Sequence, residues 1–326
     1  MRRRDFFALV GGAAAWPFAA RAQQPLMPVI GFLHAGSPEQ NVLRLAAYRK
    51  GLSDAGFVEG RNVAIEFRWA DGHVDRLPGM AADLVRRQVA VIATPGSTDA
   101  ALAAKSATAT IPIVFAAGGD VVGLGLVTSL SRPTANVTGA TSLNADIAAK
   151  RLELIRQVVP KETRYFALVN PSSVLSGSYL KDLQVGAAGL GLHVEIINAS
   201  TDADIDTAFA KLPQQPGPAL LVSTDAFFFS RHEQIARLAT RYRVPAMFDN
   251  REYAAAGGLM SYGADFYNVL QLAGVYTGRV LRGEKPADLP VLQSTKYEFV
   301  INLKTANALG LSVPPTLLAL VDEAIE

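Results

Sequence analysis

The sequence predicts an α/β protein of two doubly wound parallel-sheet lobes, and the order of its apolar segments supports this. Short apolar runs rich in β-branched residues, as at 89–93 and 111–116, flank the Ala-rich helical segment 99–109. Near-continuous apolar strands alternating with helices are typical of a parallel sheet covered on both faces. The alternation begins again after residue 140, and most of the expected strands end in a polar loop. Two α/β lobes of similar size are the natural interpretation.

The first series contains four expected strands with helices between them. Residues 28–34 form a buried apolar run, and the next segment has helical spacing that places Leu45, Tyr48 and Leu52 on one face. Each strand–helix unit has about the usual βα size. The expected strands are 28–34, 63–69, 89–93 and 111–116, and the expected helices are 41–51, 77–88 and 99–109.

The second series repeats this organisation in its elements, though not in its residues. It begins with a short extended segment at 136–139. An apolar strand at 257–263 and an amphipathic helix at 266–282, closed by Gly283, follow later. The other expected strands are 164–169, 193–197, 219–223, 245–248, 289–291 and 298–301, and the other expected helices are 148–159, 179–190, 205–212, 234–242 and 305–309.

The first residues have the pattern of an export signal. Residues 3–7 (RRDFF) form a twin-arginine pattern, residues 8–20 are apolar and rich in Ala and Gly, and residues 20–22 (ARA) offer a small-x-small cleavage site. An uncleaved membrane anchor is the alternative, but the apolar segment is shorter than the roughly 20 residues that a span needs. We therefore expect residues 1–22 to be a twin-arginine-type signal peptide, cleaved near Ala22, and the mature protein to be periplasmic.

Composition and charge exclude several classes of protein. Half of the 326 residues are hydrophobic and 18% are charged, so a large core is available. Removal of the expected signal takes four arginines and one aspartate from 31 basic and 29 acidic residues, which leaves 27 and 28 and a net charge of −1. The mature chain therefore gives no reason to expect nucleic acid as a partner. Without cysteine there is no disulfide, thiolate metal site or lipidated cysteine.

Signatures of catalysis and of nucleotide or metal binding are incomplete. Gly123-Leu124-Gly125 begins a dinucleotide fingerprint, but Thr128 stands where the third glycine is needed. His232-Glu233 begins like a zinc-binding helix, but Ala236 replaces the second ligand. The sequence has no P-loop and no G-x-S-x-G elbow. We therefore expect no catalytic residue, no metal and no cofactor.

Polar residues recur directly after the expected strands. In a doubly wound sheet these positions share one edge, where small ligands bind. Hydroxyls and loop amides suit a carboxylate, and acidic residues suit an ammonium group. An aromatic side chain could pack against Phe227, Phe228, Phe229, Phe248 or Tyr262. The alternative for each position is a helix cap or a turn. The candidate ligand-binding residues are Ser37, Thr94, Pro95, Gly96, Ser97, Thr98, Asp120, Asn170, Ser172, Ser173, Thr224, Asp225, Asp249, Asn250, Ser261 and Tyr262.

Several stretches, spread over the whole expected mature chain, resemble one family. Their combination is similar to the ABC transporter substrate-binding proteins that include tryptophan- and tyrosine-binding members. Two candidate loops depart from the family pattern: Val121 stands where the usual Asp-Pro-Val-Gly turn has proline, and Gly96 to Asp99 is more polar than the common Ala/Gln version. The stretches are 92–95 (IATP), 111–115 (IPIVF), 123–127 (GLGLV), 136–139 (NVTG), 150–154 (KRLEL), 257–263 (GGLMSYG) and 301–306 (INLKTA).

The resemblance implies a type I periplasmic-binding-protein fold of the Venus-flytrap kind. In this fold three hinge crossings join the lobes, and the ligand is enclosed between them. We expect lobe 1 at residues 28–140 plus 254–290 and lobe 2 at residues 141–253 plus 291–326, with hinges near 140, 253 and 290. The expected function is the solute-binding component of an ABC importer. Its partner would be an ABC permease in the inner membrane, and we expect the protein itself to be a monomer.

The expected ligand is an aromatic or branched amino acid. This follows from the resemblance and from the mixture of hydroxyl, acidic and aromatic residues among the candidates. An aromatic carboxylate is the alternative ligand. A ligand-sensing module that feeds a signalling partner, or an exported enzyme, are the alternative functions.

Overall fold

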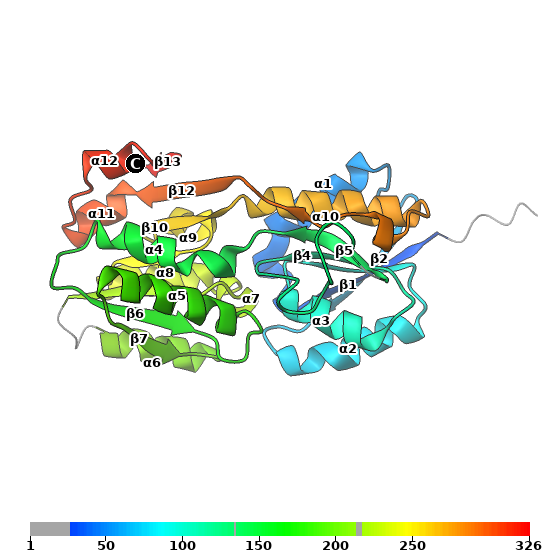
Figure 1. The fold of residues 1–326 in the computed structure, drawn as a ribbon, viewed down its shortest axis with the longest axis horizontal. Helices are drawn as coiled ribbons and strands as arrows, with labels where there is room; N and C mark the ends of the chain where they lie inside the picture. Colours follow the sequence, from blue (N-terminus) through cyan, green and yellow to red (C-terminus); the bar gives the residue numbers. More distant parts are fainter. Residues whose placement is uncertain (1–26, 134, 213–216) are drawn as a thin grey trace, which may run out of the picture.

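The computed structural model describes residues 27–133, 135–212 and 217–326, and these form two α/β lobes (Figure 1). The predicted signal peptide lies outside the described residues. No helix in the described ranges combines the length and the apolar character that crossing a membrane requires. The predicted fold class is confirmed, and most expected strands and helices are present within a few residues of their predicted bounds.

Lobe 1 contains a six-stranded parallel sheet in the order β11-β5-β4-β3-β1-β2. Helices α1 (Val42–Asp54) and α10 (Phe266–Leu281) cover one face, and α2 (Leu77–Arg86) and α3 (Thr98–Ala107) cover the other. Both faces are therefore covered, which is why the central strands β3 and β4 are apolar, whereas the edge strand β2 is half-buried and carries Glu66 and Arg68. The strands are β1 (Val29–His34), β2 (Ala64–Trp69), β3 (Val91–Pro95), β4 (Ile113–Ala117), β5 (Val137–Thr141) and β11 (Leu292–Gln293).

Lobe 2 contains a seven-stranded sheet in the order β13-β12-β10-β9-β8-β6-β7. Its pairs are parallel except β10–β12, which is antiparallel. The strands are β6 (Arg164–Val169), β7 (Val194–Asn198), β8 (Pro218–Val222), β9 (Ala246–Phe248), β10 (Met260–Ala264), β12 (Tyr297–Asn302) and β13 (Glu323–Ile325).

The helices of lobe 2 divide between the two faces of this sheet. One core cluster joins α4 (Ala148–Arg156), α5 (Ser176–Leu190), α11 (Leu303–Leu309) and α12 (Pro315–Leu318) to one face. The other cluster joins α6 (Asp202–Lys211), α7 (Ala226–Phe229), α8 (His232–Arg241) and α9 (Arg251–Ala255) to the opposite face. Lobe 2 is therefore doubly wound like lobe 1.

The chain crosses between the lobes three times, but two crossings differ from the predicted positions. Strand β10 pairs with β9 and β12, so residues 254–264 belong to lobe 2 and the second crossing falls at 264–266, not near 253. Strand β11 pairs with β5, so residues 291–293 belong to lobe 1. The turn between α9 and β10 is short, which keeps β10 beside the sheet that α9 covers.

Two backbone hydrogen bonds and one to a side chain tie the three crossings to one another. Ser294 N–H donates to Thr141 O at 2.8 Å, and Asp265 N–H donates to Lys296 O at 3.1 Å. The Asn144 side chain accepts from Ala264 N–H at 2.8 Å. The three segments therefore form one compact hinge region rather than three independent linkers.

Helices α1 and α10 approach closely because each carries a glycine at the contact. A Cβ at Gly274 would lie 2.1 Å from Tyr48 O, and a Cβ at Gly51 would lie 1.8 Å from Gln271 O. We expect Gly274→Ala to lower the free energy of unfolding by about 1–3 kcal/mol, because the helices must move apart to admit the methyl group. Urea unfolding measures this.

The matched control for this prediction is Gly79→Ala in α2, where a Cβ would meet no atom within 4 Å. There the better helix propensity of alanine should raise stability by about 0.5–1 kcal/mol. Equal stability of the Gly274 variant and the unmodified protein would contradict the close packing.

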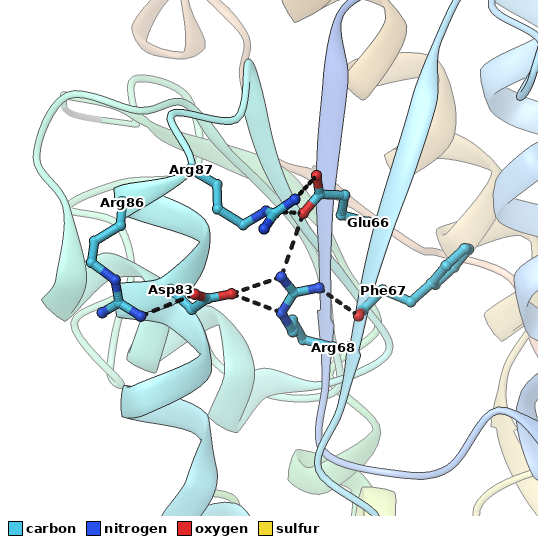
Figure 2. Close-up of polar contacts among 6 residues, drawn as sticks. All are labelled: Glu66, Phe67, Arg68, Asp83, Arg86 and Arg87. Carbon is cyan, nitrogen blue, oxygen red and sulfur yellow. Dashed lines mark hydrogen bonds and ion pairs between the residues drawn. The ribbon is translucent and has the colours of Figure 1, made fainter.

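An ion-pair network fastens helix α2 to the edge strand β2 (Figure 2). Arg68 donates from Nε and Nη2 to Asp83 Oδ2 at 3.0 and 2.6 Å, and Arg87 Nη2 donates to Glu66 Oε1 at 2.8 Å. The hydrogen bonds from Arg68 lower the pKa of Asp83, and those from Arg87 lower the pKa of Glu66. Charged side chains on an edge strand also discourage pairing with another chain.

Candidate functional site

A small cavity lies between the two lobes, at the carboxyl ends of strands from both sheets. This is the edge at which doubly wound sheets bind ligands. Lobe 1 contributes Gly96, Thr98 and Asp99 after β3 and Gly118 after β4. Lobe 2 contributes Thr224 and Asp225 after β8 and Asp249 and Asn250 after β9. The cavity measures about 30 Å³, room for about one water molecule.

The lobes touch each other around this cavity. A Cβ at Gly119 would lie 2.7 Å from Leu175 Cδ2, and Val174 N–H donates to Asp99 Oδ1 at 3.2 Å. Asp99 is on α3 of lobe 1, whereas Val174 and Leu175 precede α5 of lobe 2. The structure is therefore that of a closed pair of lobes.

The wall of lobe 1 is shaped by the loop between β3 and α3. Gly96 has a φ of +92°, a conformation that favours glycine. Ser97 caps α3, because its Oγ accepts from Ala100 N–H at 3.2 Å, and it also accepts from Ala35 N–H. Thr98 Oγ1 accepts from Gly118 N–H at 3.3 Å and joins the two loops. These caps aim the start of α3 at the cavity.

Two carboxylates face each other from opposite lobes. Asp225 caps α7, accepting from Phe228 N–H at 2.9 Å and from Asn170 Nδ2 at 3.3 Å. Burial, and then the charge of Asp225, raise the pKa of Asp99 to about 6. Burial likewise raises the pKa of Asp225. The pair therefore carries negative charge that a cation placed between the lobes would stabilise.

A third carboxylate, Asp249, lies next to a buried arginine at the hinge. Arg151 is fully buried and donates from Nε to Tyr262 O and from Nη1 to Asn144 O, each at 2.7 Å. Burial raises the pKa of Asp249, and the nearby charges of Arg151 and Arg44 oppose this rise. Arg151 thus holds two hinge crossings together and balances part of the charge of Asp249.

A second arginine reaches the cavity from α1. The guanidinium carbon of Arg44 lies 3.0 Å from the ring centroid of Phe229 in lobe 2 and 4.9 Å from that of Phe266 at the start of α10. Its Nε is 3.7 Å from Glu252 Oε1. Burial, and then the charge of Arg44, lower the pKa of His34 to about 3, so this histidine is neutral.

The structure gathers part of the predicted set around the cavity. Six candidates line it: Gly96, Thr98, Thr224, Asp225, Asp249 and Asn250. Asn170 and Ser97 support it through the hydrogen bonds described above. The candidates away from its walls are Ser37, Thr94, Pro95, Asp120, Ser172, Ser173, Ser261 and Tyr262.

Several of these residues have local roles instead. Asp120 is exposed and accepts from Val122 N–H at 3.0 Å in its own turn. Tyr262 stacks on Tyr297, with ring centroids 5.8 Å apart, and packs against the core of lobe 2. Ser37 lies in an outer crevice beside Arg231 and Gln234. The turn and packing alternatives considered for such residues therefore describe them well.

The sequence patterns missed several lining residues, which are Arg44, Asp99, Asn144, Leu175, Ala226 and Phe266. Arg44 and Phe266 lie near the starts of α1 and α10. These helices reach the cavity because they cover the same face of the sheet of lobe 1. Asp99 closes the candidate loop 96–99 but was not among the candidate residues, and its position in the first turn of α3 was the signal that could have identified it. Phe229 was among the rings considered.

Two doubly wound lobes joined by three crossings, with polar and aromatic residues enclosed between them, have the architecture of a bilobal binding protein. The family model described as ABC transporter substrate binding protein matches residues 43–325. The chain therefore belongs to the ABC transporter substrate-binding protein family, whose members are not enzymes.

Known relatives agree with this assignment. The chain is 30% identical over 263 residues to a "Tyrosine-binding protein" from Clostridioides difficile (strain R20291), covering 80% of this chain and 75% of that protein. A solved ABC domain from Streptococcus pneumoniae in complex with L-Trp is 27% identical, with a TM-score of 0.82, covering 91% of this chain and 99% of that one.

A more distant structure bears on the fold alone. A periplasmic binding protein/LacI transcriptional regulator from Alkaliphilus metalliredigens QYMF is 11% identical, with a TM-score of 0.57, covering 83% of this chain and 96% of that one. Together these likenesses confirm the type I periplasmic-binding-protein fold.

Proposed function

We propose that this chain is the periplasmic solute-binding component of an ABC importer and that its ligand is an aromatic amino acid. The observation that carries the proposal is the grouping in one interlobe cavity of acids from both lobes with the rings of Phe229 and Phe266. The relatives named for tyrosine binding and solved with L-Trp support the same ligand class.

The chemistry of the cavity suits each part of such a ligand. An ammonium group between Asp99 and Asp225 would compensate their negative charges, which burial makes unfavourable. A ring near Phe229 and Phe266 would gain apolar burial and aromatic contacts. Because these groups come from different lobes, the ligand would favour the closed arrangement over the open one.

The amino-terminal pattern supports export. In this proposal residues 1–22 direct the chain out of the cytoplasm and are removed near Ala22, and the protein delivers its ligand to a permease in the inner membrane. Mass spectrometry of protein isolated from the periplasm tests the cleavage, since the mature chain should begin near Gln23.

Calorimetry and thermal shift on residues 23–326 test the ligand. We expect L-tyrosine, L-tryptophan or L-phenylalanine to bind, and at 100 times Kd the bound ligand should stabilise the protein by about 2.7 kcal/mol. Leucine and valine test the branched-chain alternative. Absence of heat and of any thermal shift with all amino acids would refute the proposal, whereas binding confined to ring-bearing acids without an amine would favour an aromatic carboxylate.

A further inference from the structure

Arg44 stands in an unusual place for a charged side chain. It is 7% exposed, and its guanidinium lies between the ring of Phe229 from lobe 2 and the ring of Phe266 from α10, at 3.0 and 4.9 Å from their centroids. A flat cation between two rings is favourable. The space between Phe229 and Phe266, which we call the ring slot, therefore accepts a planar group.

Two of the three nitrogens of this guanidinium have no hydrogen-bond acceptor in the part of the chain that the structure describes. Nε and Nη2 of Arg44 are buried and find no acceptor among the described residues. Glu252 Oε1, at 3.7 Å from Nε, is too distant for a hydrogen bond. Burial lowers the pKa of Arg44, while the charges of Glu252 and Asp249 oppose this. Buried donors without acceptors are unfavourable, so the position of Arg44 between the lobes costs free energy in the protein without ligand.

We propose, on the basis of the proposed function, that the ring of an aromatic amino acid displaces the Arg44 guanidinium from the ring slot and that Arg44 then binds the ligand's carboxylate. The cavity volume of about 30 Å³ is far below the roughly 300–1,000 Å³ of ligand pockets, so room for a ligand has to be made by movement of lining side chains or of the lobes. Arg44 lies over two rings of the cavity wall, Phe229 and Phe266, and so occupies the position that the ring of a ligand would take.

This exchange gives every group a partner. The planar guanidinium can donate two parallel hydrogen bonds to a carboxylate, which satisfies its free donors. The ligand's ammonium, on the same carbon as the carboxylate, would then pair with Asp99 and Asp225, which also line the cavity. The ligand thereby removes the unfavourable unpaired charge of the closed lobes, and this difference between the states drives closure.

The test compares L-tyrosine with tyramine, which keeps the ring and the ammonium but has no carboxylate. Calorimetry is done with the unmodified protein and with Arg44→Met at neutral pH. We expect Arg44→Met to lower the affinity for L-tyrosine by roughly 10- to 100-fold, as for the loss of a hydrogen-bonded charge pair. Tyramine should bind Arg44→Met as well as it binds the unmodified protein, or more tightly, because the slot is no longer occupied by a cation.

Arg49→Met is the matched control, because Arg49 lies on the same helix but is exposed and paired with Glu59 at 2.6 Å. It should change neither affinity. Phe229→Leu should weaken both ligands alike, because both present a ring to the slot. If Arg44→Met is too unstable to measure, Arg44→Lys serves instead. It keeps the positive charge but cannot donate two parallel hydrogen bonds, so it should also lower the affinity for L-tyrosine and not that for tyramine.

Two results would overturn this role of Arg44. Equal weakening of L-tyrosine and tyramine by Arg44→Met would make Arg44 a part of the scaffold, and no change with either ligand would mean that it contacts neither. If instead the unmodified protein bound no aromatic amino acid, the proposed function would fail together with this inference.

Discussion

Replacement of Asp225 by asparagine is expected to weaken the binding of an aromatic amino acid by about 100-fold and to leave the fold intact. Asparagine has the same shape and caps helices as well as aspartate, so the contact with Phe228 N–H should persist. The ligand's ammonium, however, loses a buried charge partner, and such losses typically amount to 2–5 kcal/mol, with each 1.4 kcal/mol a factor of ten. Calorimetry with L-tyrosine or L-tryptophan measures the change.

The pH dependence of binding provides an independent check on this acidic pair. The pKa of Asp99 is raised to about 6, so acidification through that value protonates it in the closed cavity. Affinity for an ammonium-bearing ligand should therefore be full above about pH 6 and fall as the pH drops below it. Asp99→Asn should flatten this profile. The stability of the closed protein without a bound cation has the opposite pH dependence. Because the pKa of Asp99 is raised, its protonation stabilises the closed state, and this stabilisation is lost as the pH rises through about 6.

A ligand without an amine is the control for Asp225→Asn. The affinity for 3-(4-hydroxyphenyl)propionate should stay the same or increase in this variant, because a carboxylate ligand gains from the loss of negative charge. Unchanged affinity for the amino acid would show that its ammonium lies elsewhere, and would favour the aromatic carboxylate alternative.

Replacement of Arg151 by methionine is expected to lower the free energy of unfolding by about 3 kcal/mol or more. Methionine fills a similar volume, but the carbonyls of Asn144 and Tyr262 lose their donors. Asp249 also loses a cation that opposes the effect of burial on its pKa. Removing one member of a buried charge network typically costs 3–5 kcal/mol. Urea unfolding, with the slope compared between variants, measures the loss.

Arg156→Met is the matched control, because Arg156 is on the same helix and exposed. Its effect should stay within about 0.5 kcal/mol. Arg151→Lys should recover only part of the loss, because an ammonium cannot reach both carbonyls as the guanidinium fork does. A loss for Arg151→Met as small as that for Arg156→Met would mean that the hinge crossings are held by their backbone hydrogen bonds alone.

The fold could be predicted well from the sequence because the strands are buried on both faces and the helices are amphipathic. Residues 164–169, for example, were predicted with the bounds that β6 has. Short helices such as α7 and α9 carry too few residues for helical periodicity to be recognised. The antiparallel pairing of β10 and β12 was missed because an apolar strand has no mark of its direction.

Part of the cavity wall was predictable from polar residues that come soon after central strands, such as Asp225 after β8 and Asp249 after β9. Asp120 follows β4 by as many residues as Asp225 follows β8, but it is exposed and accepts a hydrogen bond within its own turn. Arg44 and Phe266 could not be predicted, because they enter from helices far apart in sequence that meet only after sheet 1 is formed.

The passage of the chain back into lobe 1 has a consequence for the order of folding during synthesis. Helix α10 covers one face of the first sheet and β11 completes its edge, yet both follow nearly the whole of lobe 2 in the chain. The amino-terminal lobe, although made first, has only α1 on that face until residues 266–293 emerge. Its exposed apolar strands would bind chaperones or aggregate in the meantime. Lobe 2 closes its own sheet only with β12 and β13, so the two lobes mature almost together.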